Sequence, residues 1–183
     1  MSQHLISSKR PHHVVVQQGF TLIELVVVMI VLSIIAGLTA PIFSKGLTAT
    51  RTITDNLQTI EKLRYAAERL SRELRQINYN GAAYDISTMS AAALSFTSAI
   101  DATNDISFTY SGNTLSMSYS SPALSATLTD EVSVLNFAYY DAAGVSTASN
   151  IDVAFVEFTL TLQNPSSGGS FTQRTRVALR DHS

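Results

Sequence analysis

The segment Phe20–Ala40 (FTLIELVVVMIVLSIIAGLTA) constrains the fold of this chain more than any other feature. It is apolar apart from hydroxyl side chains and one acid, Glu24. At about 1.5 Å per residue, a helix of this length spans roughly 31 Å, which matches the hydrocarbon core of a bilayer. The sequence therefore predicts a single transmembrane helix that contacts membrane lipid.

Glu24 is the unusual residue of this span. A carboxylate deep in a bilayer costs about 2.5–3.5 kcal/mol, so such residues usually face a partner. If the mature chain began at Phe20, Glu24 would lie about 6 Å along the helix from the new α-amino group, which is cationic near neutral pH. An uncleaved signal anchor would explain the hydrophobicity but not the acid. We therefore predict that Glu24 pairs with a terminal amine, on its own chain or on a neighbour.

The stretch Gln18–Glu24 (QGFTLIE), with a basic leader before it and the apolar run after it, resembles the type III signal of type IV prepilins and type II secretion pseudopilins. The resemblance implies cleavage between Gly19 and Phe20 by prepilin peptidase, and N-methylation of Phe20. It also implies that Glu24 guides the subunit into a helical filament. The implied partners are other pilins or pseudopilins and an inner-membrane assembly platform.

Pro41 lies at the end of the span, four residues after Gly37. Proline removes a helical hydrogen bond and kinks or ends a helix. One interpretation is a helix that stops and restarts here. The other is a weak point at Gly37 and Pro41 that extends during assembly, and the similarity to pilins that carry a proline at this place favours it.

The next segment, Thr50–Ile77, has apolar residues at spacings of three and four, which predicts an amphipathic helix. Its apolar stripe is expected to form core, and its arginines a solvated face, with Glu68 and Arg72 as an i,i+4 ion pair. Asn80-Gly81 is a plausible end of the helix. The stripe contains Ile53, Leu57, Ile60, Leu63, Ala67, Leu70, Leu74 and Ile77, and the arginines are Arg64, Arg69, Arg72 and Arg75.

From Leu94 the apolar period becomes two, which predicts strands. One hairpin is expected over 106–119 around Ser111-Gly112-Asn113, a second joins 135–139 to 156–162, and a last strand covers 171–179. The predicted fold is α+β and pilin-like, with a long N-terminal helix, its first half transmembrane, packed on a C-terminal antiparallel sheet. The predicted parts are a cleaved leader (1–19), a transmembrane and assembly helix (20–40), an amphipathic helix (41–80) and a β headpiece (81–183).

Composition argues against an enzyme and against a nucleic-acid binder. The chain has no cysteine, and His182 is the one histidine after Gly19, so nucleophilic triads and multi-histidine metal sites are not expected. Residues 81–183 hold three arginines against nine acids, whereas nucleic-acid binding needs a basic footprint. We expect no cofactor and no metal.

Three polar or aromatic groups in the headpiece are candidate sites. The cluster Asp101, Asn104 and Asp105 offers oxygen ligands for Ca²⁺ but lacks a loop signature, so a polar turn is expected. The adjacent acids Asp130 and Glu131 are read as a strand pair pointing to opposite faces rather than as an acid/base couple. Of the pair Tyr139-Tyr140, one ring is expected to pack in the core.

A second resemblance covers scattered positions, 135–144 (LNFAYYDAAG) and 176–181 (RVALRD). These segments are similar to J-type pseudopilins, W-type minor pilins and mannose-sensitive haemagglutinin pilus subunits. The resulting hypothesis is a minor structural subunit that primes assembly at the filament tip, with its N-terminus cytoplasmic and its headpiece periplasmic. The alternatives are a filament-displayed adhesin or substrate-binding module, and, more remotely, a membrane-anchored enzyme.

Overall fold

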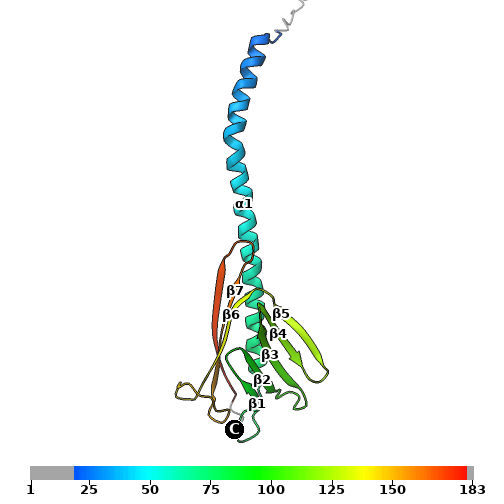
Figure 1. Ribbon diagram of the computed structural model, residues 1–183, viewed down its shortest axis with the longest axis vertical. Helices are drawn as coiled ribbons and strands as arrows, with labels where there is room; N and C mark the ends of the chain where they lie inside the picture. The colour runs from blue at the N-terminus through cyan, green and yellow to red at the C-terminus, as the bar shows by residue number, and fades with distance from the viewer. Residues whose placement is uncertain (1–18, 181–183) are drawn as a thin grey trace, which may run out of the picture. The chain divides into compact units, whose positions relative to one another are not determined.

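The computed structural model describes residues 19–180, which form one helix and eight strands. The chain divides into two compact units, 1–47 and 48–183, and the helix α1 (Leu22–Leu74) contributes to both. The strands all belong to the second unit (Figure 1). They are β1 (Ile86–Met89), β2 (Ala93–Thr97), β3 (Asp105–Ser111), β4 (Thr114–Tyr119), β5 (Leu124–Thr129), β6 (Val132–Tyr140), β7 (Phe155–Gln163) and β8 (Ser170–Ala178).

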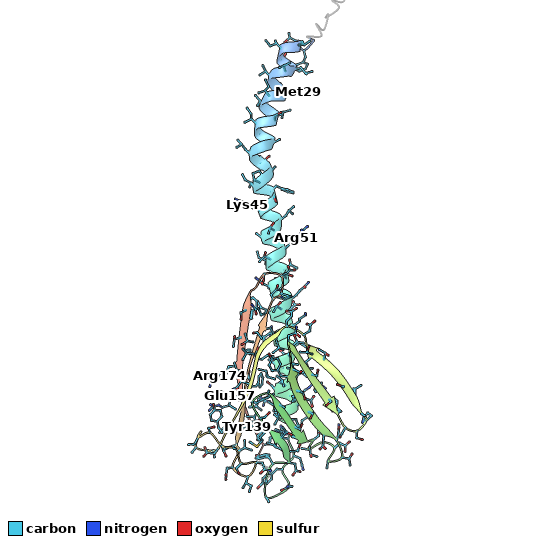
Figure 2. The ribbon with its side chains drawn as sticks, in the orientation of Figure 1. Met29, Lys45, Arg51, Tyr139, Glu157 and Arg174 are labelled. Carbon is cyan, nitrogen blue, oxygen red and sulfur yellow. The ribbon has the colours of Figure 1, made fainter. Side chains whose placement is uncertain are left out.

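In the first unit, α1 presents apolar side chains that no other described residue covers. A window of the helix has a mean hydropathy of 2.7, and none of it is buried, so α1 is long and apolar enough to cross a membrane. The hydroxyls of Ser33 and Thr39 donate to the carbonyls of Met29 (2.7 Å) and Ile35 (3.0 Å). These bonds satisfy the two hydroxyl donors within the helix itself. Figure 2 shows Met29 and Lys45 projecting from this part of α1.

The second unit contains two antiparallel sheets, in the orders β1-β2-β3-β4-β5 and β6-β7-β8. The predicted 106–119 hairpin is confirmed, because Ser111 pairs with Thr114 across a two-residue turn in which Gly112 has a φ of 66°. The predicted pairing of 135–139 with 156–162 is also confirmed, with Phe137 opposite Phe158. The expectation of a single sheet is wrong, and strands β1 and β5 were not predicted.

The core of this unit joins the C-terminal part of α1 to both sheets, as predicted for an α+β chain. Leu70 and Leu74 of the helix are fully buried, as are Phe96 and Phe108 from one sheet and Phe158 from the other. Figure 1 shows this part of the helix with one sheet to each side of it. The helix ends at Leu74, before the predicted end at Asn80-Gly81, because Ile77 already bridges to Ser98 beside β2.

The predicted apolar stripe is core only from Leu63 onward. Ile53, Leu57 and Ile60 are 60%, 54% and 39% exposed, so the expectation that they form core is wrong. At their level the helix meets the headpiece through the buried Thr59 and the Asp55 backbone instead. The apolar side chains beside them on the helix are therefore left uncovered.

Asn164, after β7, makes the polar contact with the helix at this level. Its amide donates to the Asp55 carbonyl (2.8 Å) and to the Thr59 hydroxyl (2.9 Å). Its carbonyl oxygen accepts from the amides of Ser166 and Ser167, both at 2.8 Å. The Asn164 side chain is buried and its bond to the Thr59 hydroxyl is shielded from water, so the β7–β8 turn is held against α1.

Candidate processing and assembly site

The proposed cleavage position lies just outside the helix. Gly19, Phe20 and Thr21 have no regular secondary structure, and Phe20 is 83% exposed. The Thr21 hydroxyl accepts a hydrogen bond from the Glu24 amide at 3.3 Å, and the Thr21 carbonyl accepts from Leu25 at 3.2 Å. Thr21 is therefore the N-cap, and T-L-I-E follows the capping-box pattern. The pattern is readable in the sequence, although the capping role of Thr21 was not predicted.

Glu24 is exposed and lies in the first turn of α1, where a carboxylate is favoured by the helix dipole. Within residues 19–180, no hydrogen bond or ion pair reaches its carboxylate. The helix dipole alone gives a modest reason for an acid here, typically 0.3–1 kcal/mol in water. This is less than the roughly 2.5–3.5 kcal/mol cost of burying the charge in lipid, so the need for a charged partner stands. The pairing with an amine stays a prediction.

Gly37 and Pro41 lie within one uninterrupted helix. The interpretation of a helix that stops and restarts at Pro41 is wrong, because α1 continues through it to Leu74. Proline has no amide hydrogen, so the bond that would run from position 41 to the Gly37 carbonyl cannot form. The part of α1 between them is thus short of one hydrogen bond. A weak point at this place stays a prediction.

The Asp101 group is a polar turn, as expected. The Asp101 carboxylate accepts from the Thr103 amide (3.0 Å) and hydroxyl (2.7 Å), and these bonds lower its pKa. The Asn104 side chain accepts from the amides of Ser120 and Ser121. Among residues 19–180, no group of three or more His, Cys, Asp or Glu side chains is placed to hold a metal ion.

Asp130 and Glu131 lie between β5 and β6, so the expectation that they point to opposite faces of one strand is wrong. Both contact Lys62 of α1: Asp130 at 3.1 Å, and Glu131 in a short ion pair. The hydrogen bond from Lys62 lowers the pKa of Asp130, and the bond to Glu131 raises the pKa of Lys62. The two acids are thus part of the contact between α1 and the headpiece.

The expected Glu68–Arg72 ion pair is absent from the described residues, where Glu68 contacts Arg64 at 3.3 Å instead.

Glu157, in the central strand β7, was not singled out in the sequence. It is 7% exposed and accepts hydrogen bonds from Arg174 (2.8 Å) and Arg176 (3.1 Å) of β8. Figure 2 labels Glu157 and Arg174 in this part of the headpiece. The Arg176 guanidinium lies 4.2 Å from the centre of the Tyr140 ring. Burial alone would raise the pKa of Glu157, but the two arginines outweigh burial and lower it.

Tyr139 is buried, which confirms that one ring of the Tyr139-Tyr140 pair packs in the core.

Replacing Glu157 by glutamine is expected to lower the free energy of unfolding by about 1.5–3 kcal/mol at pH 7, the usual range for hydrogen bonds to charged groups. Because the pKa is lower in the folded state, the unfolded state binds the proton first as the pH falls. The stabilisation is therefore present above the ordinary pKa of 4.5 and is lost as the pH falls through the folded-state value. Unfolding of the full chain in detergent at pH 7 to 3 should show a flatter pH dependence for Glu157→Gln. Glu68→Gln, an exposed control, should keep the wild-type slope, and equal slopes for all three chains would contradict the prediction.

The fold and this N-terminal segment define a pilin-like layout, with a long apolar helix packed through its second part against antiparallel sheets. A family model described as the prokaryotic N-terminal methylation motif matches residues 16–40. No curated protein matches the chain. The methylation motif supports a type IV pilin-like protein, and it indicates processing by prepilin peptidase and assembly with other pilins.

Proposed function

We propose that the chain is a minor pilin or pseudopilin, a non-catalytic structural subunit of a type IV pilus or a type II secretion pseudopilus. The observation that carries the proposal is the methylation motif at 16–40, which runs into an exposed apolar helix. The J-, W- and haemagglutinin-pilus-like segments at 135–144 and 176–181 support minor status and a role in priming assembly at the tip. The absence of cysteine and the single histidine after Gly19 support a non-catalytic role.

The mechanism starts at the membrane. The precursor lies in the inner membrane with its N-terminus cytoplasmic and its headpiece periplasmic, held in lipid by the first part of α1. Prepilin peptidase cuts the bond between Gly19 and Phe20, and the new amine of Phe20 is methylated. Since the methylated amine can still bind a proton, it stays a cationic partner for a carboxylate. The assembly platform then receives a helix that carries one acid and one new positive charge.

Transfer from lipid to the filament keeps the apolar surface of α1 out of water, so it costs little hydrophobic stabilisation. Glu24 gains a cationic partner in the helical bundle that lipid cannot supply. The missing hydrogen bond at Gly37 and Pro41 lets the helix lengthen locally as it packs. Together these features favour ordered addition of single subunits over random clustering.

The test is mass spectrometry of the mature N-terminus in the native membrane. We expect the chain to begin at Phe20 and to carry a methyl group on its amine. An intact chain that retains its leader, in cells with an active peptidase, would contradict the proposal. A cleaved but unmethylated chain would contradict only the methylation step. Sheared filaments from the same cells should contain the processed chain.

A further inference from the structure

A hollow of about 440 Å³ lies at the C-terminal end of α1. Three of the residues that line it are arginines, and an exposed isoleucine adds an apolar wall, 78% exposed. We call it the arginine hollow, lined by Arg72, Arg75, Gln76, Ala99, Ile100 and Arg180. It lies entirely in the second unit and has no part in the N-terminal site.

The backbone around the hollow is held in place by the fold. Arg72 is in the last turn of α1 and Arg75 directly follows the helix. The Arg180 carbonyl accepts a hydrogen bond from the Tyr84 hydroxyl at 3.1 Å. The Ala99 amide donates to the Gln76 carbonyl at 2.7 Å, which fixes the β2–β3 loop against the helix end. The three cations therefore converge on one place in the folded state, although Arg180 is far from the other two in sequence.

The positive charge of the hollow is not neutralised by the described residues. Arg72 approaches Glu73 only to 3.8 Å, and that carboxylate already pairs with Arg69 at 3.0 Å. Arg75 and Arg180 have no acidic partner within residues 19–180. The other basic residues after position 51 in that range each contact an acid within 3.3 Å, namely Lys62, Arg64, Arg69, Arg174 and Arg176. The helix dipole supplies only about half a negative charge, so the hollow keeps a net positive charge.

We propose that the arginine hollow binds an acidic segment of another subunit in the filament. Guanidinium groups bind carboxylates with paired hydrogen bonds, which makes two or three arginines a specific receptor for Asp or Glu side chains. Ile100 adds contact area for an apolar side chain next to the acid. The inference rests on the proposed function and names a second contact between subunits, separate from the α1 helix that enters the membrane.

Charge distribution favours a protein segment over a nucleic acid. Residues 81–183 carry nine acids against three arginines, so a polyanion would be repelled by most of the headpiece. Nucleic-acid binding draws its affinity from many phosphate contacts along a basic footprint. A short acidic segment brings its charge only to the hollow, where the arginines lie. The exposed Ile100 also fits a protein side chain better than a phosphate backbone.

The test is photo-crosslinking of the full chain in cells that assemble the filament, with a photoactivatable residue in place of Gln76. We expect an adduct with another pilin or pseudopilin, mapped by mass spectrometry to a peptide that contains Asp or Glu. The Arg75→Gln, Arg180→Gln double variant should lower the yield roughly tenfold or more, since losing one side of an interfacial charge pair is costly. The Arg51→Gln, Arg64→Gln double variant removes the same charge elsewhere and should leave the yield unchanged.

A charge swap completes the test. Arg75→Glu should lose the adduct, and an Arg in place of the mapped partner acid should restore it. The inference is overturned if the adduct is absent or maps to nucleic acid, to a partner peptide without an acid or to residues 181–183 of the same chain. It is also overturned if both double variants crosslink equally well.

The N-terminus and filament content of the same samples separate the two proposals. A chain that stays uncleaved or outside filaments contradicts the proposed function. A chain that is processed and present in filaments, but gives none of the expected adduct, contradicts only the inference about the hollow.

Discussion

Replacing Glu24 by alanine is expected to lower the amount of the chain in sheared filaments roughly tenfold or more, with cleavage after Gly19 unchanged. Two effects act in the same direction. Alanine removes the cost of about 2.5–3.5 kcal/mol for holding the acid in lipid, and it removes the attraction to an amine in the filament. Since about 1.4 kcal/mol corresponds to a factor of ten, the first effect alone is large enough to shift the chain towards the membrane, and the second acts in the same direction.

The measurement compares filament and membrane fractions by immunoblot and determines the mature N-terminus in both. Glu24→Gln should behave like the alanine variant, because the predicted contact needs the charge. Glu61→Ala, an exposed acid further along the same helix, is the control and should not change the distribution. Thr21→Ala removes the N-cap hydroxyl but leaves the acid, so it should assemble far better than Glu24→Ala. Normal filament content for Glu24→Ala, or loss of its cleavage, would contradict the prediction.

The second large effect is expected for Leu70→Ala, which should lower the free energy of unfolding by about 2–5 kcal/mol. Leu70 is fully buried between the helix and the sheets, so the change leaves a cavity as well as removing apolar contacts. Leu57→Ala makes the same chemical change on the same helix at a side chain that is 54% exposed. It should change the free energy of unfolding by no more than about 0.5 kcal/mol.

Both variants are best measured on the full chain in detergent by denaturant unfolding. The chain has seven tyrosines and no tryptophan, so the near-ultraviolet signal of the tyrosines reports tertiary packing. Comparable losses for the two leucines would mean that Leu57 is covered in the isolated chain, contrary to the structure. A stable Leu57→Ala chain that fails to enter filaments would show that the exposed stripe acts between subunits.

The sequence was most informative where contacts are local or where composition alone decides. The 106–119 hairpin depends on a two-residue turn and an alternating pattern within a few residues, and both were readable. The apolar span needs only length and hydropathy. The sequence did not show where along the helix the buried part of the apolar stripe begins. The spacing of Ile53, Leu57 and Ile60 shows that these residues share one face of the helix, but not whether other residues cover that face.

Polar contacts between residues far apart in the sequence were the main feature that could not be predicted. In the sequence, Glu157 lies among the apolar residues of a strand and has the pattern of an ordinary solvated acid. In the fold, β8 places Arg174 and Arg176 next to it. Lys62 likewise meets Asp130 and Glu131 across a large sequence separation. The division of eight strands into two sheets depends on the same kind of long-range pairing. In each of these cases the residue types were visible but their neighbours were set by the tertiary fold.

The capped start of α1 bears on how processing can act. Thr21 caps the helix through bonds with Glu24 and Leu25, and all three residues lie after the proposed cleavage position. The proposed cut before Phe20 would therefore add a positive charge at the start of a helix that is already capped. On the proposed function, the peptidase would change the charge at the start of the helix without changing its fold, so that hydrolysis of one bond would set the timing of assembly.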